Sequence, residues 1–202
     1  MAAGRLTVID GPDGSGKTTQ VARLAARWTD EGRDVAVFRE PGGTPVGEAI
    51  RDLLLDPDTD VTAVAEMLLY QAARAQIVET RVKPALEAGQ SVILDRYYYA
   101  TVAYQGYGLG IETELIREAA RVATGGLEPD HVVFLDVDPE IGLGRIDGLQ
   151  DRIEGRPLEF HRRVREGFLA EAERLGDRAT VIAADRPVDE VALKIHKAVG
   201  AL

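Results

Sequence analysis

The chain has 202 residues and a formal net charge of −10, from 24 basic and 34 acidic residues. This length predicts one domain, residues 1–202, and the acidic balance disfavours a nucleic-acid partner without excluding a small anionic substrate. The absence of cysteine excludes disulfides, thiolate metal sites and a cysteine nucleophile. No apolar run approaches the roughly 20 residues that cross a bilayer, and the first one is too short for a signal peptide. We therefore expect a cytoplasmic protein that does not bind membranes.

Short apolar runs rich in β-branched residues alternate with helical patterns along the chain. The runs span residues 6–9, 35–38, 92–94, 132–135 and 180–182. The helical patterns span residues 17–31, 61–88, 112–123, 158–175 and 188–198, with a kink or break expected at Pro84. Strands that are apolar throughout are typical of parallel sheets covered on both faces. The alternation predicts an α/β fold, with a doubly wound, five-stranded parallel sheet flanked by helices.

A glycine-rich loop follows the first predicted strand and leads into the first predicted helix. It reads Gly11-Pro-Asp-Gly-Ser-Gly-Lys-Thr and fits the phosphate-binding pattern G-x-x-x-x-G-K-[ST]. Backbone N–H groups and the helix start would hold phosphate, Lys17 would neutralise the outer phosphates, and the Thr18 hydroxyl would bind Mg²⁺. The expected ATP-binding residues from this loop are Gly11, Asp13, Gly14, Ser15, Gly16, Lys17, Thr18 and Thr19. Asp13 is either a solvated acid or a hydrogen-bond partner for an acceptor sugar.

Charged residues follow the second and third predicted strands, at the sheet edge where open α/β folds bind ligands. Arg39 could bind an acceptor phosphate, although a solvated arginine in a surface turn is the alternative. Asp95 could hold a water of the Mg²⁺ shell or orient the attacking phosphate, and Arg96 could clamp the phosphates that react. A structural Asp–Arg pair is the alternative for these two residues.

Tyrosines gather between positions 97 and 107. We assign Tyr97, Tyr98 and Tyr99 to the core. If the segment is helical, Thr101, Tyr104 and Gln105 share one face that suits a nucleobase and its sugar, with aromatic core packing as the alternative. Tyr70 and Arg74, four residues apart on the long helix, could stack on and hydrogen-bond a planar base, or could form a simple cation–π or ion-pair surface.

In this order, the motifs resemble those of bacterial thymidylate kinases, which phosphorylate dTMP with ATP. The resemblance implies a P-loop kinase fold with a short lid, here residues 142–157, and a homodimer. The matching motifs are Gly11-Pro-Asp-Gly-Ser-Gly-Lys-Thr-Thr, Arg39-Glu-Pro-Gly-Gly-Thr, Tyr70-Gln-Ala-Ala-Arg, Asp95-Arg-Tyr, Ala103-Tyr-Gln-Gly and Asp151-Arg-Ile-Glu.

The resemblance also implies roles for single residues. Asp13 would contact the 3′-hydroxyl side of dTMP, and Arg39 and Arg96 would clamp its phosphate. Tyr70 would stack on thymine, and Arg74 would read a thymine carbonyl.

The remaining roles implied by the resemblance concern the base pocket and the lid. Thr101 and Gln105 would line the base pocket, Tyr104 would lie under the deoxyribose, and Arg145 would pack on the ATP adenine. The phosphate loop carries no cation at Pro12, Gly14 or Ser15, so the chain resembles the subgroup with a catalytic lid arginine. Arg152 is the first candidate and Arg156 the second, with a solvated charge as the alternative for each. The expected catalytic set is Lys17, Asp95, Arg96 and Arg152, with Thr18 and Asp95 at the metal.

Three functions are compatible with these residues. The favoured one is transfer of the ATP γ-phosphate to dTMP, with Mg²⁺ as cofactor. A second keeps the chemistry but takes another (deoxy)nucleotide or a deoxynucleoside as acceptor. A third is a nucleotide-binding module without phosphoryl transfer, which Asp95 and Arg96 disfavour because a binder has little use for both.

Overall fold

Five parallel strands form one sheet in the computed structural model, which describes residues 4–146 and 151–200. The strand order is β2-β3-β1-β4-β5, and each strand extends its predicted run by no more than one residue at either end. The bounds are β1 Leu6–Asp10, β2 Val35–Arg39, β3 Ser91–Asp95, β4 His131–Asp136 and β5 Ala179–Ala183. The predicted doubly wound α/β architecture is confirmed.

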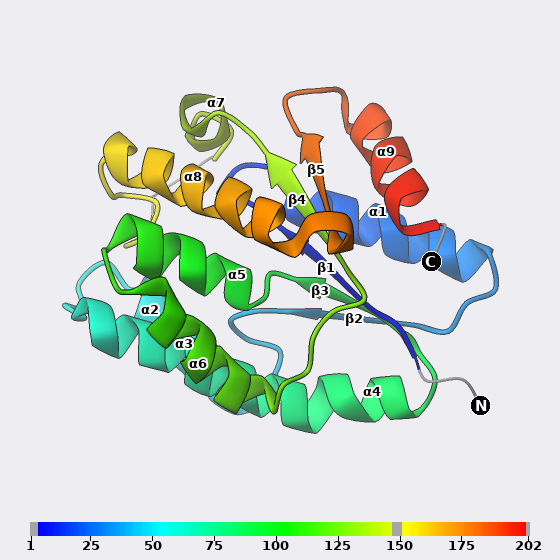
Figure 1. Cartoon of the computed structure of the whole chain (residues 1–202), viewed down its shortest axis with the longest axis horizontal. Coiled ribbons are helices and arrows are strands. Elements are labelled where there is room, and N and C mark those ends of the chain that lie inside the picture. The colour runs from blue at the N-terminus through cyan, green and yellow to red at the C-terminus, as the bar shows by residue number, and fades with distance from the viewer. Residues whose placement is uncertain (1–3, 147–150, 201–202) are drawn as a thin grey trace.

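Helices cover both faces of the sheet, so the protein has three layers (Figure 1). Helices α1 and α9 pack on one face over a core that includes Ile9, Trp28 and Ile195. The remaining long helices lie on the other face, over a core that includes Val8 and the tyrosines described below. The bounds are α1 Lys17–Asp30, α2 Pro45–Leu55, α3 Ala63–Ile77, α4 Lys83–Glu87, α5 Tyr98–Thr101, α6 Thr113–Thr124, α7 Pro139–Leu143, α8 Leu158–Leu175 and α9 Val188–Gly200.

Neighbouring residues on the strands face opposite layers, which explains why the predicted strands are apolar throughout. Val8 belongs to the core on the α3 and α8 side, whereas Ile9 belongs to the core under α1 and α9. A strand that is buried on both faces needs apolar side chains in both orientations.

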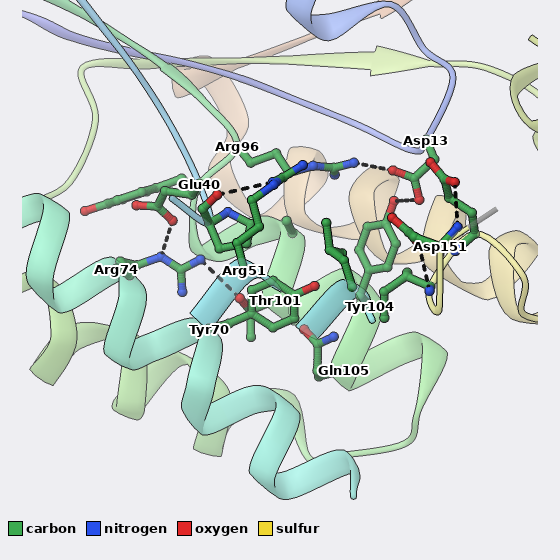
Figure 2. Close-up of a pocket in the computed structure, with 16 residues that line it drawn as sticks. Asp13, Glu40, Arg51, Tyr70, Arg74, Arg96, Thr101, Tyr104, Gln105 and Asp151 are labelled. Carbon is green, nitrogen blue, oxygen red and sulfur yellow. Dashed lines mark hydrogen bonds and ion pairs between the residues drawn. The ribbon is translucent and has the colours of Figure 1, made fainter. Parts of the chain in front are cut away.

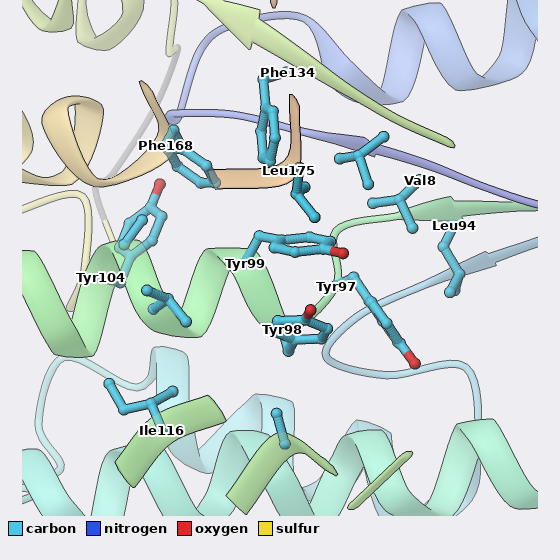
Figure 3. Close-up of a cluster of buried hydrophobic side chains, with 14 of the residues drawn as sticks. Val8, Leu94, Tyr97, Tyr98, Tyr99, Tyr104, Ile116, Phe134, Phe168 and Leu175 are labelled. Atoms are coloured by element: carbon cyan, nitrogen blue, oxygen red, sulfur yellow. The ribbon is translucent and has the colours of Figure 1, made fainter. Parts of the chain in front are cut away.

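The tyrosine run after β3 supplies much of the larger core, as Figure 3 shows. Tyr97, Tyr98 and Tyr99 are all buried, which confirms their assignment to the core. The Tyr97 hydroxyl donates to the Leu127 carbonyl at 2.9 Å, and the Tyr99 ring meets Phe134 edge-on with centroids 5.7 Å apart. The run therefore anchors the segment that follows it, which carries three of the predicted site residues.

The helical layer contains two helices, α2 and α7, that were not predicted. The predicted helix 61–88 consists of α3, a π-helical turn over Val78–Val82, and α4, with Pro84 in the first turn of α4. A wider turn before a proline accommodates the missing N–H and the bulk of its ring. A second π-helical segment, Val102–Gly108, continues from α5.

Among the described residues, no helix has both the length and the apolar character of a membrane span.

Candidate active site

The phosphate loop joins β1 to α1 and depends on glycine geometry. Gly14 and Gly16 have φ angles of 70° and 84°, which L side chains rarely adopt. A Cβ on Gly14 would lie 1.9 Å from the Gly142 carbonyl oxygen, so the loop packs closely against the start of the lid. Gly16 is also the N-cap of α1 and supplies no capping side chain. The first N–H groups of α1 therefore remain available for a phosphate.

The Lys17 ammonium is held inside the loop. Its Nζ donates to the carbonyl oxygens of Gly11 (3.1 Å) and Pro12 (2.7 Å) and to Ser15 Oγ (3.4 Å). Burial, reinforced by the nearby Arg96, lowers the pKa of Lys17 to about 8. This lysine is thus positioned and desolvated at the site where the pattern predicts phosphate binding.

Thr18, in the first turn of α1, contacts Asp95 at the end of β3. The Thr18 hydroxyl donates to Asp95 Oδ2 at 2.9 Å, because Asp95 ends β3, beside β1. The described residues contain no cluster of three or more His, Cys, Asp or Glu side chains that could hold a metal. Mg²⁺ commonly binds through one or two protein oxygens, water and substrate phosphates, so the hydroxyl and carboxylate oxygens of this pair fit it.

Arg96 and Tyr104 meet on the carboxylate of Asp13. Arg96, a non-glycine residue with a φ of 70°, pairs with Asp13 and donates through Nη1 to the Gly11 carbonyl at 3.0 Å. The Tyr104 hydroxyl donates to Asp13 Oδ2 at 2.7 Å. Burial alone would raise the pKa of Asp13, but Arg96, Lys17 and Tyr104 together hold it below its usual value. Asp13 is therefore an ionised, fully engaged acid, which excludes its interpretation as a solvated loop residue.

Two adjoining pockets open at the carboxyl ends of the strands. The loop pocket surrounds the phosphate loop, and its lining includes Gly14, Gly16, Lys17, Thr18, Thr19, Arg39 and Asp95. The tyrosine pocket, drawn in Figure 2, is lined among others by Tyr70, Arg74, Tyr97, Thr101, Tyr104 and Gln105. Both pockets share Asp13, Glu40, Arg51, Arg96 and Glu154. Two ligands could thus meet end to end at Arg96.

Arg74 is fixed in the wall of the tyrosine pocket and is 2% exposed. It donates through Nε to Glu40 (2.7 Å), through Nη1 to Gln71 Oε1 (2.7 Å) and through Nη2 to Thr101 Oγ1 (3.2 Å). Burial raises the pKa of Glu40 to about 7 against the pull of Arg74. Among the described residues, two of the five N–H groups of Arg74 have no partner and remain for a ligand. Its ion pair with Glu40 and its cation–π contact with Tyr97, 5.7 Å from the ring centroid, are both buried, so the alternative of a surface pair with Tyr70 does not apply.

Arg39 and Arg51 occupy different positions. Arg39 lines the loop pocket but not the tyrosine pocket, and it donates twice to the Glu48 carboxylate at 2.8 Å. Arg51, on α2, lines both pockets, and one contact, to the Pro41 carbonyl at 3.2 Å, holds its guanidinium. Burial and the neighbouring Arg39 and Arg96 lower the pKa of Arg51, as expected for a cation among cations. An anion placed between the pockets would relieve that repulsion.

The lid residues lie over these pockets, although residues 147–150 of the predicted lid are outside the described part of the chain. Arg145 donates to the carbonyl oxygens of Gly14 (3.3 Å) and Ala184 (3.0 Å), between the phosphate loop and the turn after β5. Arg152 lines neither pocket, and it donates through Nη1 to Glu66 and through Nε to the Leu54 carbonyl. The structure therefore does not bring Arg152 to the phosphate loop.

Most of the other predicted residues line the pocket expected for them, except Gly11, Ser15 and Arg145 on the donor side and Arg39 on the acceptor side. Gly11 and Ser15 contact Lys17 from outside the loop pocket, and Arg145 lies next to it. Every predicted residue for the acceptor nucleotide except Arg39 lines the tyrosine pocket. Sequence reasoning missed Glu40, which directly follows Arg39, and Arg51, which lies on the helix that was not predicted.

Comparison with known proteins agrees with this geometry. The family model described as thymidylate kinase matches residues 9–195. The chain belongs to the thymidylate kinase family. It is 47% identical to the thymidylate kinase of Deinococcus radiodurans over 201 residues, with 98% of each chain covered. It is 42% identical to the thymidylate kinase of Chlorobaculum parvum over 208 residues, covering 98% of this chain and 96% of that one.

The fold of the thymidylate kinase family is also confirmed by a solved structure. The crystal structure of thymidylate kinase from Ehrlichia chaffeensis superposes with a TM-score of 0.82 at 31% identity, covering 98% of this chain and 99% of that chain. The resemblance inferred from the motifs is thus confirmed over nearly the whole length of this thymidylate kinase family member.

Proposed function

We propose that the protein transfers the γ-phosphate of ATP to dTMP, giving ADP and dTDP. An oxygen of the dTMP phosphate forms a bond to the γ-phosphorus while the bond from that phosphorus to the ADP oxygen breaks. Such a reaction needs positioning and charge neutralisation more than covalent help. ATP would place its phosphates in the loop pocket, and dTMP would place its base in the tyrosine pocket.

The observation that carries this proposal is the shared wall between the two pockets. Arg96 and Arg51 line both pockets, so either guanidinium can reach phosphates that enter from the two sides. Lys17 and the N–H groups of the phosphate loop lie on the donor side. Cations fixed at the meeting point of two anionic groups lower their repulsion and hold them in line.

We infer Mg²⁺ as the cofactor, held through the Thr18 hydroxyl and through Asp95, directly or by way of water. Bound there, the ion would neutralise charge on the donor phosphates. Asp95, at 2.9 Å from Thr18, orients that hydroxyl.

The lid is proposed to exclude water and protect ATP from hydrolysis. Asp151, Ile153 and Glu154 already line the tyrosine pocket, so this part of the lid would cover a bound acceptor. We propose that Arg145, which contacts the Gly14 and Ala184 carbonyls, packs on the adenine ring. As a catalytic group, Arg152 would have to exchange Glu66 for the transferred phosphate.

We also propose that the protein forms a homodimer through α2, α3 and α6. These neighbouring helices expose six large apolar side chains: Val46, Leu53, Val64, Leu68, Leu115 and Val122. An apolar surface spread over three adjacent helices is typical of an interface. We further propose that the protein functions in the cytoplasm, because the absence of cysteine suits a reducing compartment.

A coupled assay for ADP formation tests the proposal. With ATP and Mg²⁺, we expect the purified protein to phosphorylate dTMP in preference to dCMP, dGMP and dAMP. Activity on dTMP no greater than on the other three would contradict the substrate assignment, and nucleotide binding without any turnover would favour a binding module.

A further inference from the structure

The carboxylate of Glu66 is buried where α3, the lid and the π-helical segment meet. Glu66 is 0% exposed. Its Oε2 accepts hydrogen bonds from Arg152 Nη1 at 2.6 Å and from Arg156 Nη2 at 2.7 Å. Its Oε1 accepts from Gln105 Nε2 at 2.7 Å. Both oxygens are therefore engaged, and the carboxylate links the lid to a residue of the tyrosine pocket.

The contact with Glu66 determines which end of the Gln105 amide faces the pocket. A carboxylate paired with two guanidinium groups only accepts hydrogen bonds, so the Gln105 NH₂ group, rather than its carbonyl, must face it. The Gln105 Oε1 is then left buried, with no hydrogen-bond partner among the described residues. In Figure 2 the Gln105 side chain extends toward the ring of Tyr70, in the wall of the tyrosine pocket.

Gln105 and Arg74 together give the pocket a directional hydrogen-bond pattern. Arg74 has two N–H groups without a hydrogen-bond partner in residues 4–146 and 151–200, so it offers donors. Gln105 offers an acceptor, because Glu66 holds its NH₂ group on the other side. Thymine presents a carbonyl beside an N–H on its pairing edge, which complements a donor and an acceptor. Cytosine presents an amino group beside an unprotonated nitrogen, which is the reverse pattern.

We propose that Glu66 is a specificity-determining residue. It acts by positioning Gln105: the carboxylate holds the amide so that Oε1 faces the tyrosine pocket, which favours a base with an N–H donor on that edge. Arg152 and Arg156 support this arrangement by holding the carboxylate in place. The inference rests on the proposed function, because it requires the base of the acceptor nucleotide to occupy the tyrosine pocket.

The test compares two acceptors that differ only on the pairing edge, dTMP and 5-methyl-dCMP. Glu66→Gln keeps the size of the side chain but can donate as well as accept, so either orientation of the Gln105 amide becomes possible. We expect the ratio of kcat/KM for dTMP to kcat/KM for 5-methyl-dCMP to fall about tenfold. Glu79→Gln is the matched control, because Glu79 is exposed near the same helix and pairs with Lys83. Its ratio should equal that of the unmodified protein.

Gln105→Ala provides an independent test, since it removes the side-chain oxygen that accepts the hydrogen bond from the base. Its ratio should fall by a similar factor, and the double variant with Glu66→Gln should show no further fall, because both changes remove one feature. If Glu66→Gln does not fold, Glu66→Asp is the substitute. It retains the negative charge that faces the arginines, but its shorter side chain moves the carboxylate away from the Gln105 NH₂ group. It should lower the ratio in the same way.

A role of Glu66 in stability alone would lower kcat/KM for both acceptors and leave their ratio unchanged, and that result would overturn the proposal. The proposed function fails differently. In that case the unmodified protein would show no preference for dTMP over other monophosphates. A preference for dTMP that persists in folded Glu66→Gln contradicts only the role of Glu66.

Discussion

Replacing Arg51 with alanine should weaken the binding of dTMP far more than replacing Arg39. Arg51 lines both pockets and, within the part of the chain that the structure describes, makes one hydrogen bond, at 3.2 Å to the Pro41 carbonyl. Arg39 already donates twice to Glu48 at 2.8 Å and is half-exposed. A phosphate can therefore take up the free donors of Arg51, whereas it would have to compete with a carboxylate for those of Arg39.

The size of the effect follows from the number of contacts that are lost. A hydrogen bond to a charged group contributes about 1.5–3 kcal/mol, which corresponds to about 10- to 150-fold in affinity. Arg51→Ala should raise the KM for dTMP within this range. Arg39→Ala removes a partly exposed ion pair of the kind that contributes about 0–1 kcal/mol, so its KM should change by less than about fivefold.

Initial rates at saturating ATP, with dTMP varied, give both constants for each variant. A contact made equally in the ground state and the transition state changes KM and leaves kcat nearly constant. Melting temperatures would establish that both variants are folded. The reasoning is refuted if Arg51→Ala leaves the KM for dTMP unchanged, or if Arg39→Ala raises it more than Arg51→Ala does.

Four further changes test other parts of the site and the fold. Asp95→Asn should reduce kcat about 100-fold without lowering the melting temperature, measured by the coupled assay and calorimetry. Gly14→Ala should abolish measurable ATP binding by calorimetry, because its Cβ would meet the Gly142 carbonyl oxygen at 1.9 Å. Leu68→Glu should convert a dimer to a monomer in light scattering, whereas a monomeric unmodified protein would contradict the interface. Glu40, with a pKa of about 7 against 4.5 when unfolded, takes up a proton on folding, so its stabilising contribution is complete below about pH 4.5 and is lost as pH rises through 7. Glu40→Gln should flatten the dependence of melting temperature on pH in that window.

The parts of the fold that could be predicted are those with strong local signals. The phosphate loop and the buried strands were predicted because glycine spacing and continuous apolar runs do not depend on distant contacts. The core position of Tyr97–Tyr99 was confirmed for the same reason, since the run follows a buried strand. Helix α2 was missed even though Thr44 caps it and Pro45 begins it, a local signal that was available.

The missed site residues depend on contacts between distant segments. Arg51 is one of several charged residues on a surface helix, and only the fold brings it to Arg96. Glu66 has the sequence context of a solvated acid, yet it is buried because Arg152 and Arg156, some 90 positions later, fold over it. The catalytic role of Arg152 or Arg156 stays a prediction, because both side chains donate to Glu66.

The three oxygen atoms around the Lys17 ammonium have a consequence for nucleotide binding. The loop oxygens already accept hydrogen bonds from the Lys17 ammonium, so the conformation of the loop is fixed before a nucleotide binds. An entering phosphate exchanges one set of oxygen contacts for another and does not have to order a flexible chain first. Little binding free energy is then spent on immobilising the backbone, and more of it remains for aligning the reacting groups.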